Sequence, residues 1–329
     1  INEFMAKNTR TITNAHGDKS DWIEIYNGTG AGTNLAGWHL TDSAGNLTKW
    51  SFPSTNIGAG GYVIVFADGA YTSSVYGGQL CAGFGMKEDP PEYLALVRPD
   101  GLTVAHHYSP TYPIQYSDIS YGLGTSNELR YFNVPTPGLA NNSGFTPVAA
   151  AAFDYQRGFY SNAFSLSLTS STAGATIRYT TDGSVPSETG GTVYSGPVAI
   201  TNTTCLRAVA YKTPGDYRPL AAVTHTYVFL ADVIRQSPNG ELPGPGWPNS
   251  GVNGQELNYG MDSNVVNAAA YSNEMVAAMQ AVPTISLVTY LSNLFNAATG
   301  IYVNAGQSGP LWERPVSVEL INPDGSPGF

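Results

Sequence analysis

Four polar side chains near the start of the chain could take part in chemistry. Asp21, Glu24, His39 and Asp42 all fall within residues 21–46, DWIEIYNGTGAGTNLAGWHLTDSAGN. Carboxylates supplied by loops are ligands that hard cations such as Ca²⁺ prefer. The same side chains can instead be solvent-facing or turn-forming groups of a structural domain. The residue types alone leave both interpretations open for Asp21, Glu24 and Asp42.

Histidine and cysteine give weaker signals. His106 and His107 are adjacent in a strand-like segment, where neighbouring side chains point to opposite faces. One packed and one solvent-facing imidazole is therefore favoured over a shared metal. Cys81 and Cys205 lie far apart in the sequence. They form either one disulfide between two domains or two separate buried thiols.

Sequence signatures of catalysis are missing. The chain contains no P-loop, no Ser-His-Asp order and no metal-spaced set of Cys and His. The charged cluster Trp312-Glu313-Arg314 is no exception. Adjacent side chains of a strand face opposite sides, which favours salt links of Glu313 and Arg314 to other partners. We expect no catalytic residues and no cofactor, with calcium as the alternative at the three carboxylates.

Composition narrows the class of protein. A chain of 329 residues suggests two or three domains. Charged residues make up 12%, against roughly a quarter in ordinary soluble proteins. The 37 Gly and 22 Pro residues are typical of an extracellular all-β protein. A net charge of −10 without a run of Lys or Arg argues against nucleic-acid binding, and no apolar run approaches the roughly 20 residues of a membrane span. Because the chain begins with Ile, we expect either that a signal peptide has been removed or that the sequence is a fragment.

Apolar residues alternate with a period of two along most of the chain, which predicts strands. In residues 21–27, DWIEIYN, this pattern indicates a half-buried strand. Residues 61–69, GYVIVFADG, predict a central strand with both faces covered. Residues 92–109, EYLALVRPDGLTVAHHYS, predict a hairpin that turns at Pro99-Asp100-Gly101. We expect a sandwich of short antiparallel strands.

Ordered motifs in the first part of the chain resemble a known family. They are INEFMAKN (residues 1–8), DWIEIYN (21–27), LAGWHLTD (35–42), WSFP (50–53), IGAGGYVIVFADG (57–69) and VPTPGLANN (134–142). Residues 1–142 look like a lamin-tail domain of the bacterial secreted type. The resemblance implies an immunoglobulin-like β-sandwich without catalytic residues. Asp21 and Glu24 then become solvent-facing or turn-bonded groups, and Asp42 becomes an Asx-type turn former.

The middle of the chain, residues 143–230, resembles a second family. IRYTTDGSVPS (residues 177–187), followed by YSGPV (194–198), is similar to the small chitobiase/hexosaminidase C-terminal-type domain. The resemblance implies an accessory β-sandwich without an active site. Asp182 lies in the turn, where its carboxylate is expected to bond the backbone of the next two residues.

Residues 231–329 follow a different pattern. Residues 262–283 begin with the capping residues Asp262 and Ser263, carry an approximate apolar stripe and end at Pro283, which predicts a helix. Residues 282–329, which include NLFNAATGIYVN and WERPVSVELI, resemble the opening of a spore-coat-protein-H-like (CotH) kinase domain. The resemblance implies an incomplete domain whose catalytic residues lie beyond Phe329. We therefore expect a partial α+β segment after two tandem sandwiches.

Two classes of function remain open. The first is a non-catalytic structural or adhesive module of a secreted or cell-surface protein, including a subunit of an extracellular assembly or filament. Its partners would be other copies of itself, other surface proteins or polysaccharide. The second is the accessory N-terminal region of a larger secreted enzyme, a CotH-like phosphotransferase or one that acts on polysaccharide.

Overall fold

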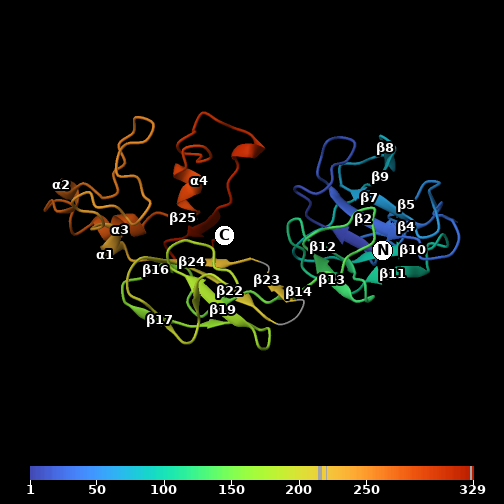
Figure 1. The fold of residues 1–329 in the computed structure, drawn as a ribbon, viewed down its shortest axis with the longest axis horizontal. Coiled ribbons are helices and arrows are strands. Elements are labelled where there is room, and N and C mark those ends of the chain that lie inside the picture. Colours follow the sequence, from blue (N-terminus) through green and yellow to red (C-terminus); the bar gives the residue numbers. More distant parts are fainter. Residues whose placement is uncertain (214–216, 220, 327) are drawn as a thin grey trace. The chain divides into compact units, whose positions relative to one another are not determined.

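The chain divides into two compact units, Ile1–Pro147 and Val148–Phe329 (Figure 1). A computed structural model describes residues 1–213, 217–219, 221–326 and 328–329. Strands dominate both units, as expected for mainly β sandwiches. In the described part of the chain, no helix has the length and apolar character required to cross a membrane.

The first unit contains two larger sheets. One has the strand order β13-β12-β1-β2-β7-β9-β8, the other has the order β11-β10-β4-β5, and β3 pairs separately with β6. Their bounds are β1 Glu3–Met5, β2 Asp21–Tyr26, β3 Thr33–Asn34, β4 His39–Thr41, β5 Trp50–Ser51, β6 Asn56–Ile57, β7 Tyr62–Ala67, β8 Val75–Tyr76, β9 Gln79–Ala82, β10 Leu94–Val97, β11 Val104–Tyr108, β12 Ser120–Leu123 and β13 Leu129–Phe132. Neighbouring strands run antiparallel except β7 and β9, which are parallel.

Aromatic side chains join the two larger sheets of the first unit. Phe4 on β1 is fully buried. Its ring centroid lies 5.1 Å from that of Tyr108 on β11 and 5.1 Å from that of Tyr112. Such ring pairs add to the free energy gained from burying their apolar surface. The core of the sandwich therefore lies between β1 and β11.

The hairpin at residues 92–109 and a strand within residues 21–27 are both confirmed, but that strand is not half-buried. Strands β10 and β11 pair antiparallel, and Gly101 in their turn has a φ of 69°, a conformation that glycine adopts without a steric penalty. By contrast, β2 buries both of its faces from Trp22 to Ile25. Trp22 packs with Met5 and Phe66, and the opposite pairing partners β1 and β7 make β2 an interior strand. The alternation of residues therefore did not predict how much of the strand is covered.

Residues beyond 142 contribute to the first unit. The backbone N–H of Tyr131 donates to the carbonyl of Phe145 at 3.1 Å, and the return bond measures 2.8 Å. The Phe145 side chain is 4% exposed. We therefore expect a fragment of residues 1–147 to unfold cooperatively at a higher temperature than a fragment of residues 1–142. Calorimetry on both fragments tests this, and equal transition temperatures would show that Phe145 does not stabilise the unit.

The second unit begins with another sandwich. Its largest sheet has the order β16-β24-β22-β19-β20, while β15 pairs with β18 and β17 pairs with β21. The bounds of the strands from the junction onward are β14 Thr146–Val148, β15 Ala152–Phe153, β16 Gly158–Phe159, β17 Phe164–Leu166, β18 Leu168–Thr169, β19 Thr176–Thr180, β20 Thr192–Val193, β21 Val198–Ile200, β22 Thr204–Tyr211, β23 Tyr217–Pro219 and β24 Val223–Val228. Leu166, Ile200, Leu206 and Tyr227 are the largest fully buried side chains of its core.

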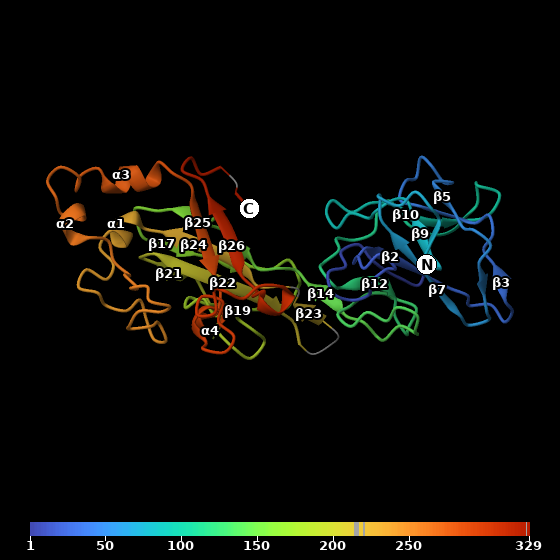
Figure 2. The same cartoon turned by 90° about the horizontal axis from the view of Figure 1, so that it is seen from above.

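The last segment adds short helices and one hairpin to the second unit. Its elements are α1 Leu230–Val233, α2 Ser263–Val266, α3 Met275–Gln280, β25 Thr284–Val288, α4 Leu291–Phe295, the 3₁₀ helix η1 Pro310–Trp312 and β26 Ser317–Ile321. Strands β25 and β26 pair antiparallel with each other, and β26 contacts β24 of the sandwich (Figure 2).

The continuous helix predicted for residues 262–283 is wrong. The structure has two short helices, α2 and α3, separated by turns at residues 267–274. The expected cap is present, since the Asp262 carboxylate accepts the N–H of Asn264 at 2.8 Å. Only the second half of the apolar stripe packs, with Val276 and Met279 against Val228, Leu230 and Ile321. Because α2 buries no residue, no tertiary contact extends it.

Candidate functional site

Asp21 lies at the first position of β2, and its carboxylate is held by a loop. Oδ2 accepts the backbone N–H of Met86 at 2.9 Å. The pKa of Asp21 is raised to about 7, mainly by burial and also by the neighbouring carboxylates of Asp68 and Glu88, against the lowering effect of the hydrogen bond from Met86. Asp21 is therefore bonded to a loop, one of the two structural roles implied by the family resemblance.

Glu24 is not solvent-facing, because its side chain is fully buried. The carboxylate accepts Nδ2 of Asn2 at 2.7 Å and the N–H of Gly138 at 2.5 Å. Burial raises its pKa to about 7. Glu3 lies directly opposite on β1 and binds the same closing segment through the hydroxyl of Thr136 at 2.7 Å. The two glutamates fasten residues 134–142 to the sheet, so Glu24 is turn-bonded.

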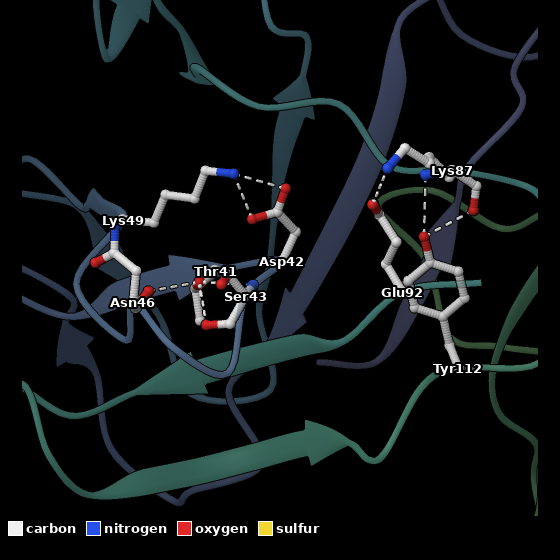
Figure 3. Close-up of polar contacts among 8 residues, drawn as sticks. All are labelled: Thr41, Asp42, Ser43, Asn46, Lys49, Lys87, Glu92 and Tyr112. Atoms are coloured by element: carbon white, nitrogen blue, oxygen red, sulfur yellow. Dashed lines mark hydrogen bonds and ion pairs between the residues drawn. The ribbon is translucent and has the colours of Figure 1, made fainter. Parts of the chain in front are cut away.

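Asp42 does not form the turn that was predicted for it. Its two carboxylate oxygens accept Nζ of Lys49 at 2.6 and 2.8 Å. Thr41 takes the turn-forming role instead, because its hydroxyl accepts the N–H of Ser43 at 3.0 Å and donates to the carbonyl of Asn46 at 2.7 Å (Figure 3). A threonine hydroxyl can bond the backbone two residues on as an aspartate does, which the sequence pattern did not distinguish.

Tyr112, Lys87 and Glu92 form a second set of hydrogen bonds and an ion pair in the first unit. The hydroxyl of Tyr112 donates to the carbonyl of Lys87 at 2.7 Å, and the N–H of Lys87 donates to that hydroxyl at 3.1 Å. Nζ of Lys87 pairs with Glu92 at 2.5 Å (Figure 3). These polar groups hold a loop against the sandwich, and their carboxylate is already paired.

The three candidate cation ligands therefore have three separate sets of partners. Asp21 binds a loop amide, Glu24 binds the closing segment and Asp42 binds a lysine. Within the described ranges, no three or more His, Cys, Asp or Glu side chains are grouped as a metal site would need. The alternative of calcium at Asp21, Glu24 and Asp42 remains a prediction.

The histidines and cysteines are placed as structural groups. His106 is half-buried, and burial lowers its pKa to about 4, whereas His107 is exposed. Cys81 and Cys205 are both free thiols. Burial raises the pKa of each, to about 11 for Cys205. A thiol with a raised pKa stays protonated and is a poor nucleophile. His39 contacts the hydroxyl of Ser51 through Nδ1 at 2.8 Å.

Two further predictions from the sequence have different outcomes. The Asp182 carboxylate accepts the N–H of Ser184 at 3.0 Å and its hydroxyl at 2.6 Å, which confirms the predicted bond to Ser184. The predicted bond to the N–H of Gly183 is not found among the described residues. Arg314 forms no salt link among the described residues. Its Nε donates to the carbonyl of Thr299 at 3.0 Å, and its guanidinium lies 5.6 Å from the Trp312 ring centroid. The predicted ion pairing of Arg314 is therefore wrong, because backbone carbonyls and an aromatic ring hold the cation.

Glu319 is a buried charged residue that the sequence analysis missed. It is 1% exposed on β26. Its carboxylate accepts the hydroxyl and the N–H of Thr226 on β24 at 2.5 and 3.3 Å, and it lies 3.4 Å from Nε of Arg157. The Thr226 hydroxyl also contacts the hydroxyl of Ser286 on β25 at 2.8 Å. The only sequence signal was an acidic residue inside the apolar strand SVELI.

This polar cluster joins the last segment to the second sandwich. Burial raises the pKa of Glu319, while the hydrogen bonds from Thr226 and the charge of Arg157 oppose that shift. A buried carboxylate is tolerated only with such partners. The cluster therefore holds strands β25 and β26 against β24 of the second sandwich.

Two family models match separate stretches of the chain. Residues 1–110 match the family model described as Lamin Tail Domain, and residues 155–218 match the model described as Chitobiase/beta-hexosaminidase C-terminal domain. No match was found among the curated proteins. The likeness of residues 282–329 to a CotH kinase domain remains a prediction. The chain is thus similar, over two separate stretches, to two families of immunoglobulin-like sandwich modules that are often non-catalytic.

Proposed function

We propose that this chain is a non-catalytic structural module of a secreted or cell-surface protein, with adhesion to other surface proteins or to copies of itself as its role. One observation carries the proposal: the candidate carboxylates are bonded to structural partners. Asp21, Glu24 and Asp42 hold a loop, the closing segment and a lysine. Carboxylates that are used in this way do not form the paired acid and base of a hydrolase.

The low content of charged residues and the two sandwich modules support an extracellular location. Charged residues make up 12% of the chain, and the match at residues 155–218 is to a family named after carbohydrate-active enzymes.

The location can be tested on intact cells of the source. Antibodies raised against the purified chain should label unpermeabilised cells or the culture medium, and brief protease treatment of the cells should remove the cell-bound signal. A cytoplasmic protein, followed in the same samples, serves as the control for lysis. Signal that appears only after permeabilisation would contradict the proposal.

We also expect the purified chain to lack phosphotransfer and glycosidase activity. The reason is that burial raises the pKa of both thiols and that Asp21, Glu24 and Asp42 are held in structural bonds. Incubation with labelled ATP and with chromogenic glycosides measures both activities. Because a contaminant can mimic activity, each assay is repeated with the Asp21→Asn and Glu319→Gln variants and after a second purification. Activity that stays with the chain through both purifications would contradict a non-catalytic role.

A second candidate function is an accessory region of a larger enzyme. The outer face of the hairpin β25–β26 favours it, because Ile285 and Leu287 are 59% and 66% exposed and Val318 is 39% exposed. Apolar strand faces of this kind are normally covered by another element. The sequence encoded after Phe329 decides between the two functions: acidic catalytic motifs there favour the enzyme, and a stop or a repeat array favours the structural module.

A further inference from the structure

A cavity of about 250 Å³ lies where the last segment meets the second sandwich. It is lined by Val185, Arg207, Ala222, Val288, Thr289, Tyr290, Pro315, Val316 and Ser317. These residues come from the turn before β20, from strands β22, β25 and β26 and from their flanking loops. Sites for drug-sized ligands have volumes of about 300 Å³ or more. This cavity is smaller, so it suits a ligand that consists of a single small ring.

Arg207 is the charged residue of this cavity. Its side chain belongs to β22, between Thr180 on β19 and Thr224 on β24. The residue is only 9% exposed. Its Nη1 donates to the carbonyl of Gly183 at 3.0 Å, while Nε is buried without a hydrogen-bond partner. Within the described part of the chain, no carboxylate forms an ion pair with Arg207.

The carboxylates around the cavity are bonded elsewhere. Glu319 accepts hydrogen bonds from Thr226 and pairs with Arg157, and Asp182 is bonded to Ser184. A buried guanidinium without a counter-ion is costly, because desolvation of its charge is not compensated. The chain as a whole carries a net charge of −10. The buried guanidinium of Arg207 is a positive group in this acidic chain, and an anionic ligand would compensate its charge.

The rest of the lining indicates what kind of anion would fit. The Tyr290 side chain is 45% exposed, and its hydroxyl is fixed by the N–H of Val185 at 3.3 Å. The Ser317 hydroxyl makes no hydrogen bond among the described residues, so it is free to bind a ligand. Val185, Val288 and Val316 supply apolar walls. A ligand with one carboxylate, a hydroxyl and an apolar ring face matches these groups.

We propose that this cavity binds an acidic monosaccharide unit, such as a uronic acid, with its carboxylate on Arg207. Nη1 is bonded to Gly183 and Nε is buried, so Nη2 is the donor that a carboxylate can reach, and the positive charge of the guanidinium strengthens that hydrogen bond. Tyr290 offers a face for the sugar ring, and Ser317 offers a hydrogen-bonding group for a sugar hydroxyl. The inference goes beyond the proposed structural role and does not depend on where the protein is located.

Calorimetric titration of the full chain with glucuronate at low ionic strength tests the site. We expect glucuronate to bind, and glucose, which lacks the carboxylate, to bind at least about tenfold more weakly, since it cannot form the hydrogen bond between charged groups. Arg207→Met should weaken glucuronate binding by a similar factor. An apolar residue of similar length often replaces a buried charge without loss of stability, and thermal unfolding checks that the variant is folded.

Two further variants keep the test decisive. Arg178→Met is the matched control: Arg178 lies on the adjacent strand β19, bonds the carbonyls of Glu188 and Gly191 and does not line the cavity. Its affinity for glucuronate should equal that of the wild type. If Arg207→Met does not fold, Val316→Trp takes its place, because Val316 is 48% exposed and a larger side chain there should fill the cavity and abolish binding.

Three results would overturn the proposal. One is the absence of heat or of a thermal shift with millimolar glucuronate on the folded wild type. Another is equal loss of binding in Arg178→Met, which would place the ligand elsewhere. The third is sulfate binding as tightly as glucuronate, which would show a site for small anions without selectivity for an acidic sugar.

Discussion

Replacing Glu319 with alanine should release the hairpin β25–β26 from the second sandwich while the sandwich stays folded. The carboxylate is almost completely buried and accepts two hydrogen bonds from Thr226. Its removal also leaves Nε of Arg157 without its anionic neighbour. Because the Arg157 side chain is 29% exposed and its charge is partly solvated, the main loss is that of the buried hydrogen bonds to Thr226, which costs about 1–3 kcal/mol. Hydrogen exchange should therefore rise sharply in residues 284–288 and 317–321 and much less in β22.

Two variants control the Glu319 experiment. Glu313→Ala removes an exposed carboxylate from the same segment and should leave hydrogen exchange unchanged. Glu319→Gln keeps one carbonyl oxygen as an acceptor for Thr226, so its effect should be smaller than that of alanine. Unchanged exchange in Glu319→Ala, or the same increase in Glu313→Ala, would show that the polar cluster does not hold the hairpin.

Local patterns predicted the elements whose causes are local. The hairpin of residues 92–109 follows from a turn sequence in which glycine provides a positive φ. The role of Asp182 likewise depends on a partner only two residues away. Strand alternation and turn chemistry depend on residues within a few positions of each other. They can therefore be predicted from the sequence without knowledge of tertiary contacts.

The features that were not predicted depend on contacts between residues far apart in the chain. Glu24 bonds Gly138, which lies 114 positions along the chain, and Glu319 bonds Thr226, which lies 93 positions away. Neither burial could be inferred from a pattern of period two. The predicted helix at residues 262–283 failed for a related reason, because few of its apolar residues find a surface to pack against and short helices depend on such packing.

The first unit should lose stability as the pH rises through neutrality because of Asp21. Burial raises the pKa of this carboxyl to about 7, above the usual value of about 3.9. A raised carboxyl pKa means that the folded state prefers the protonated form. The stabilisation is therefore complete at pH values below the unfolded pKa and is lost as the pH rises through about 7.

Other groups titrate in the same range, so the prediction is stated as a difference between two proteins. Burial lowers the pKa of His106 to about 4 and that of the Ile1 amine to about 5, and both effects favour folding at higher pH. Glu24, whose pKa burial also raises to about 7, acts in the same direction as Asp21. These contributions are common to the wild type and to Asp21→Asn, and they cancel when the two unfolding free energies are subtracted.

Asp21→Asn keeps an oxygen that can accept the N–H of Met86 but cannot ionise. At pH 4 the variant and the wild type should be similar in stability, and at pH 8 the variant should be more stable by about 2 kcal/mol. The full effect would be 1.36 kcal/mol for each pKa unit between the unfolded and the folded value. The expected effect is smaller than that product because Asp21 is partly exposed. Urea unfolding of a fragment of residues 1–147, followed by the fluorescence of its tryptophans, measures the difference across pH 4 to 8.

Asp118→Asn is the matched control. Burial of Asp118 is outweighed by hydrogen bonds from Thr9 and Arg10, which lower its pKa, so its difference from the wild type should be constant above pH 5. A flat difference for Asp21→Asn as well would show that the carboxylate of β2 is solvated in the folded state and is not the desolvated group that its contacts with the loop indicate.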